Sequence, residues 1–116
     1  MSRLLVRIAA LSGAVAVAAS AFGAHGASGK AAEWLRTGGE YEMVHALVAI
    51  VAVQLRARSA ALLLLAGSIL FAATLYLMAL GWPRWLGAVT PIGGMGMIAG
   101  WLLLAWQAAP VGGGRR

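Results

Sequence analysis

Residues 60–80 read AALLLLAGSILFAATLYLMAL, a run of 21 residues without a charged side chain. At a rise of 1.5 Å per residue, a helix of this length matches the ~30 Å hydrocarbon core of a bilayer. Three further apolar stretches accompany it, so that four candidate spans fill most of the chain: residues 4–24, 40–56, 60–80 and 86–107. The sequence therefore predicts an all-α integral membrane protein with one domain, residues 1–116.

The composition agrees with a membrane protein and excludes several function classes. Of the 116 residues, 62% are hydrophobic and 10% are charged, and the mean hydropathy is +0.88. A soluble domain of this size needs a polar coat that so few polar residues cannot supply. The formal net charge of +6 comes from scattered basic residues that form no continuous face, so a nucleic-acid partner is not expected. The absence of cysteine excludes disulfides and thiolate metal sites.

The basic residues also predict an orientation. With four spans, one side of the membrane holds six arginines and no acid, and the other side holds three basic residues and Glu33. Lys and Arg in short loops favour the cytoplasm, so both termini should be cytoplasmic and the bundle should run up-down-up-down. The six arginines are Arg3, Arg7, Arg56, Arg58, Arg115 and Arg116; the three opposing residues are Lys30, Arg36 and Arg84.

The first apolar segment has an alternative interpretation. Arg3 and Arg7 before an apolar run, followed by Ala19–Ala21, are also typical of a cleaved signal peptide. Cleavage would leave three spans and an outer N-terminus. Small residues at a four-residue spacing favour a retained span, because they form a face for a neighbouring helix.

Residues 25–39 form the longest predicted loop. Within it, residues 30–36 read as a short interfacial helix, and Thr37–Gly39 read as its end. The second span would then begin at Glu40 and place His45 about 7 Å along that helix.

Stripes of small residues predict where the helices pack closely. Gly96 and Gly100 form a GxxxG pair in the fourth span, preceded by Gly93 and Gly94. In lipid, such residues let helix backbones approach each other. The predicted packing residues are Ser12, Ala16, Ser20, Gly67, Gly93, Gly94, Gly96 and Gly100.

Polar residues inside the spans predict a cluster near the outer surface. Ionisable groups in lipid are costly unless they are paired or hydrated, and Glu42 and His45 share one helix face. The predicted cluster consists of His25, Tyr41, Glu42, His45 and Thr90. Three interpretations remain open: a structural hydrogen-bond network, a proton or small-solute site, or a metal or haem site. The last is weakened because the Glu-x-x-His motif occurs only once.

Several blocks of sequence, taken together, resemble a known family. They are Ala21–Gly26 (AFGAHG), Tyr41–Leu47 (YEMVHAL), Gly67–Phe71 (GSILF), Thr90–Gly94 (TPIGG) and Gly100–Leu102 (GWL). In this order they are similar to the small membrane proteins grouped as domain of unknown function 423, and to the eukaryotic transmembrane protein 256 group. The resemblance implies a four-helix protein of bacterial inner membranes with no assigned biochemical activity. Many relatives have Gln after the Tyr, where this chain has Glu42.

The function expected from these observations is that of a structural or accessory membrane component. No acid dyad or hydrolase motif is present, so an enzyme is not expected, and no cofactor is indicated. The alternatives are a small-solute or proton-linked transport component and a haem- or metal-binding protein. The expected partners are the lipid bilayer and, through the small-residue stripes, a second copy or another membrane protein.

Overall fold

The computed structural model describes residues 2–108, and it is built almost entirely from helices. Four long helices are joined by short links: α1 (Ser2–His25), α2 (Gly29–Gln54), α3 (Arg58–Ala79) and α4 (Thr90–Gln107). A short 3-10 helix, η1 (Arg84–Ala88), precedes α4. No strand occurs within residues 2–108, so the all-α class predicted from the sequence is confirmed.

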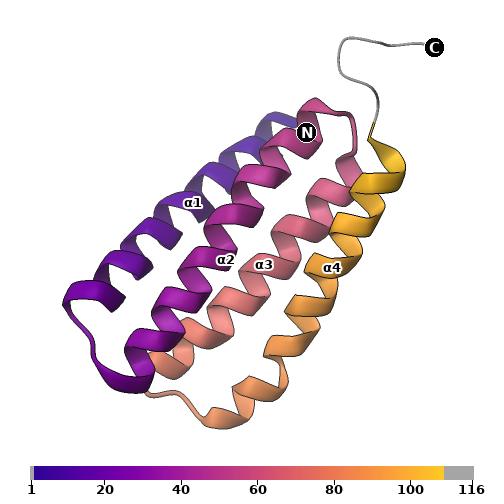
Figure 1. Cartoon of the computed structure of the whole chain (residues 1–116). Coiled ribbons are helices and arrows are strands. Elements are labelled where there is room, and N and C mark those ends of the chain that lie inside the picture. The colour runs from indigo at the N-terminus through magenta and orange to yellow at the C-terminus, as the bar shows by residue number, and fades with distance from the viewer. Residues whose placement is uncertain (1, 109–116) are drawn as a thin grey trace.

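The four helices lie side by side in chain order, each antiparallel to the one before it (Figure 1). α1 packs chiefly on α2, α2 on α3, and α3 on α4. This order follows from links too short to let consecutive helices separate. One end of the bundle carries the start of α1, the α2–α3 turn and the end of α4, which we call the turn end. The other end carries the α1–α2 link and η1, which we call the η1 end.

Helix α2 corrects the predicted start of the second span. Residues 30–36 do not form a separate interfacial helix, because α2 runs unbroken from Gly29 to Gln54. A Cβ at Gly38 would lie 2.7 Å from Cε1 of Tyr76, and a Cβ at Gly39 would collide with the side chain of Ser20. Both glycines are therefore close-packing positions. This packing offsets the low helix propensity of glycine, about 1 kcal/mol per residue, and the helix continues.

Helix α4 begins at Thr90, and the first residues of the predicted span 86–107 belong to η1 instead. Pro91 is in the first turn, and within the described chain the N-cap residue Val89 makes no side-chain cap. The hydroxyl of Thr90 instead lies 2.6 Å from the hydroxyl of Thr74 on α3. It also donates to the carbonyl oxygen of Leu86 at 3.3 Å. Thr90 thus joins α4 to α3.

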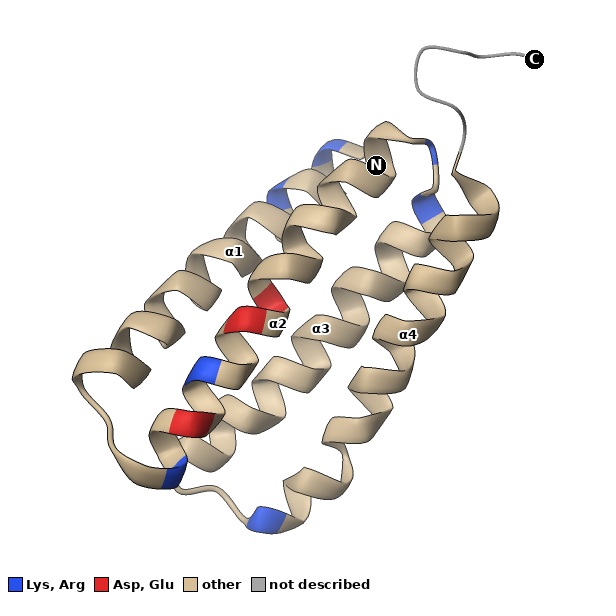
Figure 2. Ribbon diagram, in the orientation of Figure 1, with Lys and Arg blue, Asp and Glu red and all other residues tan. Residues whose placement is uncertain are grey.

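Three segments are long and apolar enough to cross a membrane: Ser2–His25, Arg58–Ala79 and Arg84–Gln107. Helix α2 is the fourth long helix, and charged residues in its first half lower its hydropathy. Figure 2 shows basic residues at the two ends of the bundle, and on α2 a basic residue between acidic ones. Large apolar side chains such as Leu11 and Leu102, both 68% exposed, cover the outside of the bundle. Such a surface suits lipid rather than water.

The interior is built from small residues, which bring the helix backbones close together. Ala16, Ala52 and Ala60 are fully buried. Between α3 and α4, a Cβ on Gly67 would lie 2.8 Å from the backbone N of Met97, and a Cβ on Gly100 would lie 2.9 Å from the backbone N of Leu64. Dispersion contacts between closely spaced backbones are the main attraction available to helices in lipid.

The predicted packing residues fall into two groups. Ser12 and Ala16 are buried, Ser20 lies against Gly39, and Gly67, Gly93, Gly96 and Gly100 lie in the α3–α4 contact. Gly94 is the exception, because no other described atom outside its own helix comes within 4 Å of a Cβ built there. It is one residue away from Gly93 on α4 and borders open space between α2 and α4 rather than the α3–α4 contact.

Candidate functional site

A buried carboxylate connects three of the four helices. Glu42 on α2 is 4% exposed. Its Oε2 accepts a hydrogen bond from the Ser12 hydroxyl of α1 at 2.6 Å, and its Oε1 accepts one from the Tyr76 hydroxyl of α3 at 2.6 Å. Distances of this length are at the short end of the range for O–H···O hydrogen bonds. Both oxygens of Glu42 are therefore occupied by side chains of neighbouring helices.

A buried imidazole connects α2 to α4. His45 is 5% exposed, its Nδ1 lies 2.6 Å from the carbonyl oxygen of Tyr41, and its Nε2 lies 2.9 Å from Nε1 of Trp101. An indole nitrogen can only donate and a carbonyl oxygen can only accept. The pair of bonds therefore requires a neutral imidazole that carries its proton on Nδ1. Protonation at Nε2 would break the bond to Trp101.

Two aromatic rings contact His45, and a third packs against one of them. The Tyr41 ring stacks on the imidazole with centroids 6.1 Å apart and meets the Phe71 ring at 5.0 Å. The Trp101 ring stands edge-on to His45 at 5.8 Å. These rings border a cavity of about 390 Å³ between α2 and α4, lined by Tyr41, His45, Phe71, Gly94, Met97, Ile98 and Trp101. The cavity is largely apolar, and both nitrogens of His45 are already bonded.

Tyr41, Glu42 and His45 therefore lie together, but His25 and Thr90 lie elsewhere. His25 is exposed at the end of α1, and Gly23 beside it packs against Ala32 and Leu35. From Ala32 to His45 is roughly 20 Å along the axis of α2 at 1.5 Å per residue. His25 and His45 do not come together as the sequence predicted. Thr90 is bonded to Thr74 rather than to the cluster.

Tyr76 and Trp101 were not predicted to join the cluster, and Ser12 was predicted only as a packing residue. A signal for Tyr76 was present, because a Tyr hydroxyl inside an apolar span needs a partner. The same reasoning applies to Trp101, because an indole N–H well inside a span also needs a hydrogen-bond partner. What the sequence did not supply was the relative rotation of the helices, which decides the partner of each group.

Glu42 forms no ion pair with any residue of the described chain. The one salt bridge within residues 2–108 is exposed and joins Lys30 to Glu33 at 3.9 Å. No group of three or more His, Asp or Glu side chains in that range could hold a metal ion together. The haem or metal interpretation relied on His25 joining Glu42 and His45, and this geometry does not occur.

Comparison with known proteins identifies the family. The family model described as protein of unknown function (DUF423) matches residues 19–94. The chain belongs to this family. The DUF423 match bears out the resemblance carried by the sequence blocks, four of which lie wholly within the matched residues.

Curated relatives cover most of the chain. The UPF0382 membrane protein SH2409 of Staphylococcus haemolyticus is 38% identical over 88% of this chain and 92% of its own length. The UPF0382 inner membrane protein YgdD of Escherichia coli K12 is 39% identical over 89% of this chain and 87% of its own length. The UPF0382 membrane protein YwdK of Bacillus subtilis is 35% identical over 91% of this chain and 96% of its own length. No solved structure matches the chain.

These relatives indicate the general class of the protein, but no biochemical activity. The chain is a small membrane protein of a family without an assigned biochemical activity. Its apolar helices and lipid-compatible surface agree with that description.

Proposed function

We propose that the chain is a non-enzymatic structural or accessory component of the bacterial inner membrane. In this proposal its four helices span the bilayer, and its buried polar residues hold them in register. The observation that carries the proposal is that both oxygens of Glu42 and both nitrogens of His45 are hydrogen-bonded within the bundle. A site whose polar atoms are all used internally stabilises the bundle and offers little to a solute.

The outer faces of the bundle support an accessory role. Helices α1 and α4 flank the row, and each packs chiefly on one long neighbour. Their outward faces present side chains such as Val17, Ile98 and Leu102, which are 56%, 62% and 68% exposed. These faces are available to lipid, to a second copy or to another membrane protein.

The proposed topology has four spans and both termini in the cytoplasm. Arg3, Arg7, Arg56 and Arg58 lie at the turn end, which would be the cytoplasmic end under the positive-inside rule. Arg115 and Arg116, which contribute to the predicted charge asymmetry, lie outside the described residues. Ser12 of α1 bonds to Glu42, which supports a retained first helix rather than a cleaved signal.

Reporter fusions test this topology. A green fluorescent protein fused after Ala57 or at the C-terminus should fluoresce, because it folds in the cytoplasm. Alkaline phosphatase fused after Ser28 should be active, because it requires the outer side. A fluorescent fusion at Ser28 or an active phosphatase at the C-terminus would contradict the four-span proposal.

The structural role of His45 has its own test. Trp101→Phe removes the N–H that His45 accepts and keeps an aromatic ring, so the free energy of unfolding should fall by about 1 kcal/mol. His45→Ala should cost more, since it also removes the bond to Tyr41. Unfolding can be followed by circular dichroism as SDS is titrated into dodecylmaltoside micelles.

Trp106→Phe is the control, because Trp106 is 82% exposed and its loss should change stability little. The losses from His45→Ala and Trp101→Phe should also be non-additive, since they remove one shared bond. A His45→Ala protein as stable as wild type would refute the structural role. It would then favour the transport alternative.

A further inference from the structure

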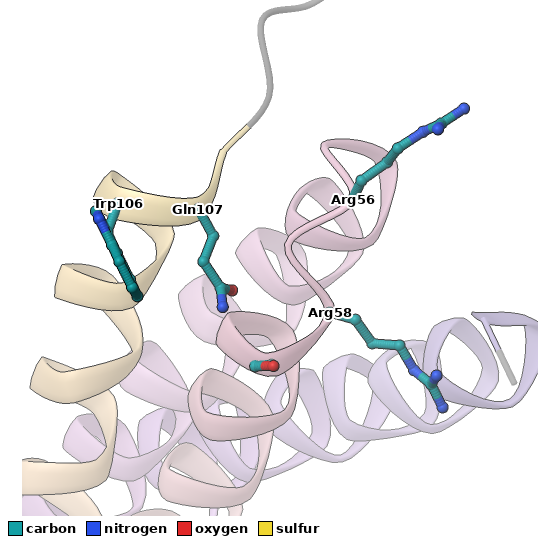
Figure 3. A pocket seen from close by; sticks show the side chains of 5 residues that line it. Arg56, Arg58, Trp106 and Gln107 are labelled. Atoms are coloured by element: carbon teal, nitrogen blue, oxygen red, sulfur yellow. The ribbon is translucent and has the colours of Figure 1, made fainter.

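A second cavity lies at the turn end, away from Glu42 and His45. It measures about 440 Å³ and lies between the α2–α3 turn and the last turn of α4. Figure 3 shows the residues at this cavity, with Gln107 reaching from α4 toward the start of α3. The lining residues are Arg56, Arg58, Ser59, Trp106 and Gln107.

The cavity rim carries two positive charges without acidic partners. Arg56 and Arg58 are exposed and form no ion pair within the described chain. In Figure 3 their side chains point away from Gln107, toward the surroundings. Exposed arginine side chains are long and mobile enough to turn toward an anion at the rim. The nearest elements, α3 and the end of α4, contribute no carboxylate.

Arg56 holds its position at a conformational cost. Its φ is 64°, the left-handed region that glycine usually occupies at a helix end. The N–H of Ala57 donates a hydrogen bond to the carbonyl oxygen of Ala52 at 2.8 Å. This bond spans Arg56 and ends α2. A non-glycine residue in this region is strained, and strain of this kind often marks functional positions.

Gln107 lines the same cavity and carries an unsatisfied polar group. Its Oε1 is buried and has no hydrogen-bond partner within residues 2–108. A buried polar atom without a partner destabilises the folded protein unless a bound molecule supplies the missing hydrogen bond. The amide offers an acceptor in Oε1 and a donor in its NH₂ group. A fitting ligand therefore carries a hydroxyl as well as an anionic oxygen.

We propose that this cavity binds the headgroup of an anionic phospholipid that carries hydroxyls, of the phosphatidylglycerol type. The phosphate is bound by Arg56, Arg58 and the first N–H groups of α3, where no side-chain cap is made within the described chain. The headgroup hydroxyl donates to Oε1 of Gln107. Trp106, at the same end of α4, lies beside the glycerol region, a usual position for interfacial Trp.

The proposal rests on the proposed transmembrane placement of α3 and α4, which puts their ends at headgroup level. Its test does not depend on which side that end faces, because it uses the purified full chain in detergent. Native mass spectrometry would measure binding of phosphatidylglycerol and of phosphatidylcholine. Wild type should bind phosphatidylglycerol as a single preferred lipid and show no comparable binding of phosphatidylcholine.

Two variants remove parts of the site, and a third is a matched control. Arg56→Gln/Arg58→Gln should weaken phosphatidylglycerol binding about thirtyfold. Gln107→Leu keeps the charge and should weaken it about fivefold. Arg3→Gln/Arg7→Gln removes the same charge from the same end of the bundle and should leave binding unchanged. Circular dichroism checks that each variant is folded.

Three outcomes would overturn the proposal. If the control variant loses as much phosphatidylglycerol binding as Arg56→Gln/Arg58→Gln, the lipid is attracted to the basic surface in general and not to this cavity. Unchanged binding in both site variants would show that the cavity is not used. Displacement of the lipid by inorganic phosphate would assign the cavity to a soluble anion, whereas failure of phosphate to compete supports the lipid.

Discussion

Gly93→Ala should lower the free energy of unfolding by about 2–3 kcal/mol, a large effect for one methyl group. A Cβ at Gly93 would lie 2.6 Å from the backbone N of Phe71 and 2.7 Å from the carbonyl oxygen of Gly67. Both are backbone atoms of α3, so they cannot move aside as a flexible side chain would. The two helices must separate along their contact and lose dispersion contacts on both sides. The measurement is SDS titration in dodecylmaltoside micelles.

Gly94→Ala is a control from the adjacent position. Among the described atoms, none outside its own helix comes within 4 Å of a Cβ there. The substitution should therefore be neutral, or stabilising by about 0.5–1 kcal/mol, because alanine favours the helix over glycine. Gly67→Ala should behave like Gly93→Ala, since a Cβ there would lie 2.9 Å from the carbonyl oxygen of Gly93. Equal stability of the Gly93 and Gly94 variants would mean that α3 and α4 do not pack as the structure shows.

The same pair of glycines shows what the sequence alone can and cannot predict. Because both residues are glycine, the sequence indicated close packing at Gly93 and at Gly94. Adjacent residues on a helix point about 100° apart, however, so the two cannot both face the same neighbouring helix. Only the partner helix decides which one is at the contact. The lengths and apolar character of α1, α3 and α4 were predictable, because a bilayer sets these quantities directly.

The prediction for His25 failed because of one helix boundary. Gly38 and Gly39 were taken as a break, so the second span was started at Glu40 and His45 was placed near its outer end. Helix α2 begins at Gly29, which places His45 roughly 24 Å from that end at 1.5 Å per residue. A glycine pair that ends a helix in water can continue it against a close neighbour, and the local sequence does not distinguish the two.

The grouping of Tyr41, Glu42 and His45 was predictable, because it depends only on helical spacing within one segment. The partners Ser12, Tyr76 and Trp101 come from three other helices. Their choice depends on how each helix is rotated about its axis. The free-energy cost of burying polar groups in lipid requires hydrogen-bond partners for Glu42 and His45, but it does not identify them.

Glu42→Leu should destabilise the bundle more than any other change at the polar cluster, by about 2–4 kcal/mol. It removes two hydrogen bonds that join α1 and α3 to α2. It also leaves the hydroxyls of Ser12 and Tyr76 facing a leucine. Glu42→Gln should retain most of the stability, because its oxygen accepts from one hydroxyl and its NH₂ group donates to the other. SDS titration of the purified variants measures both effects.

Glu40→Leu is the control for Glu42→Leu, because it removes a carboxylate from the same helix without removing the hydrogen bonds to α1 and α3. Glu40 lies on the same helix but is exposed, so its replacement should not destabilise the protein. A triple variant, Ser12→Ala/Glu42→Leu/Tyr76→Phe, should regain most of the stability that Glu42→Leu loses, because no hydroxyl is then left without a partner. If the triple variant is instead no more stable than Glu42→Leu alone, the cost lies in lost packing around the carboxylate. If Glu42→Leu is as stable as Glu40→Leu, the carboxylate does not hold the three helices together.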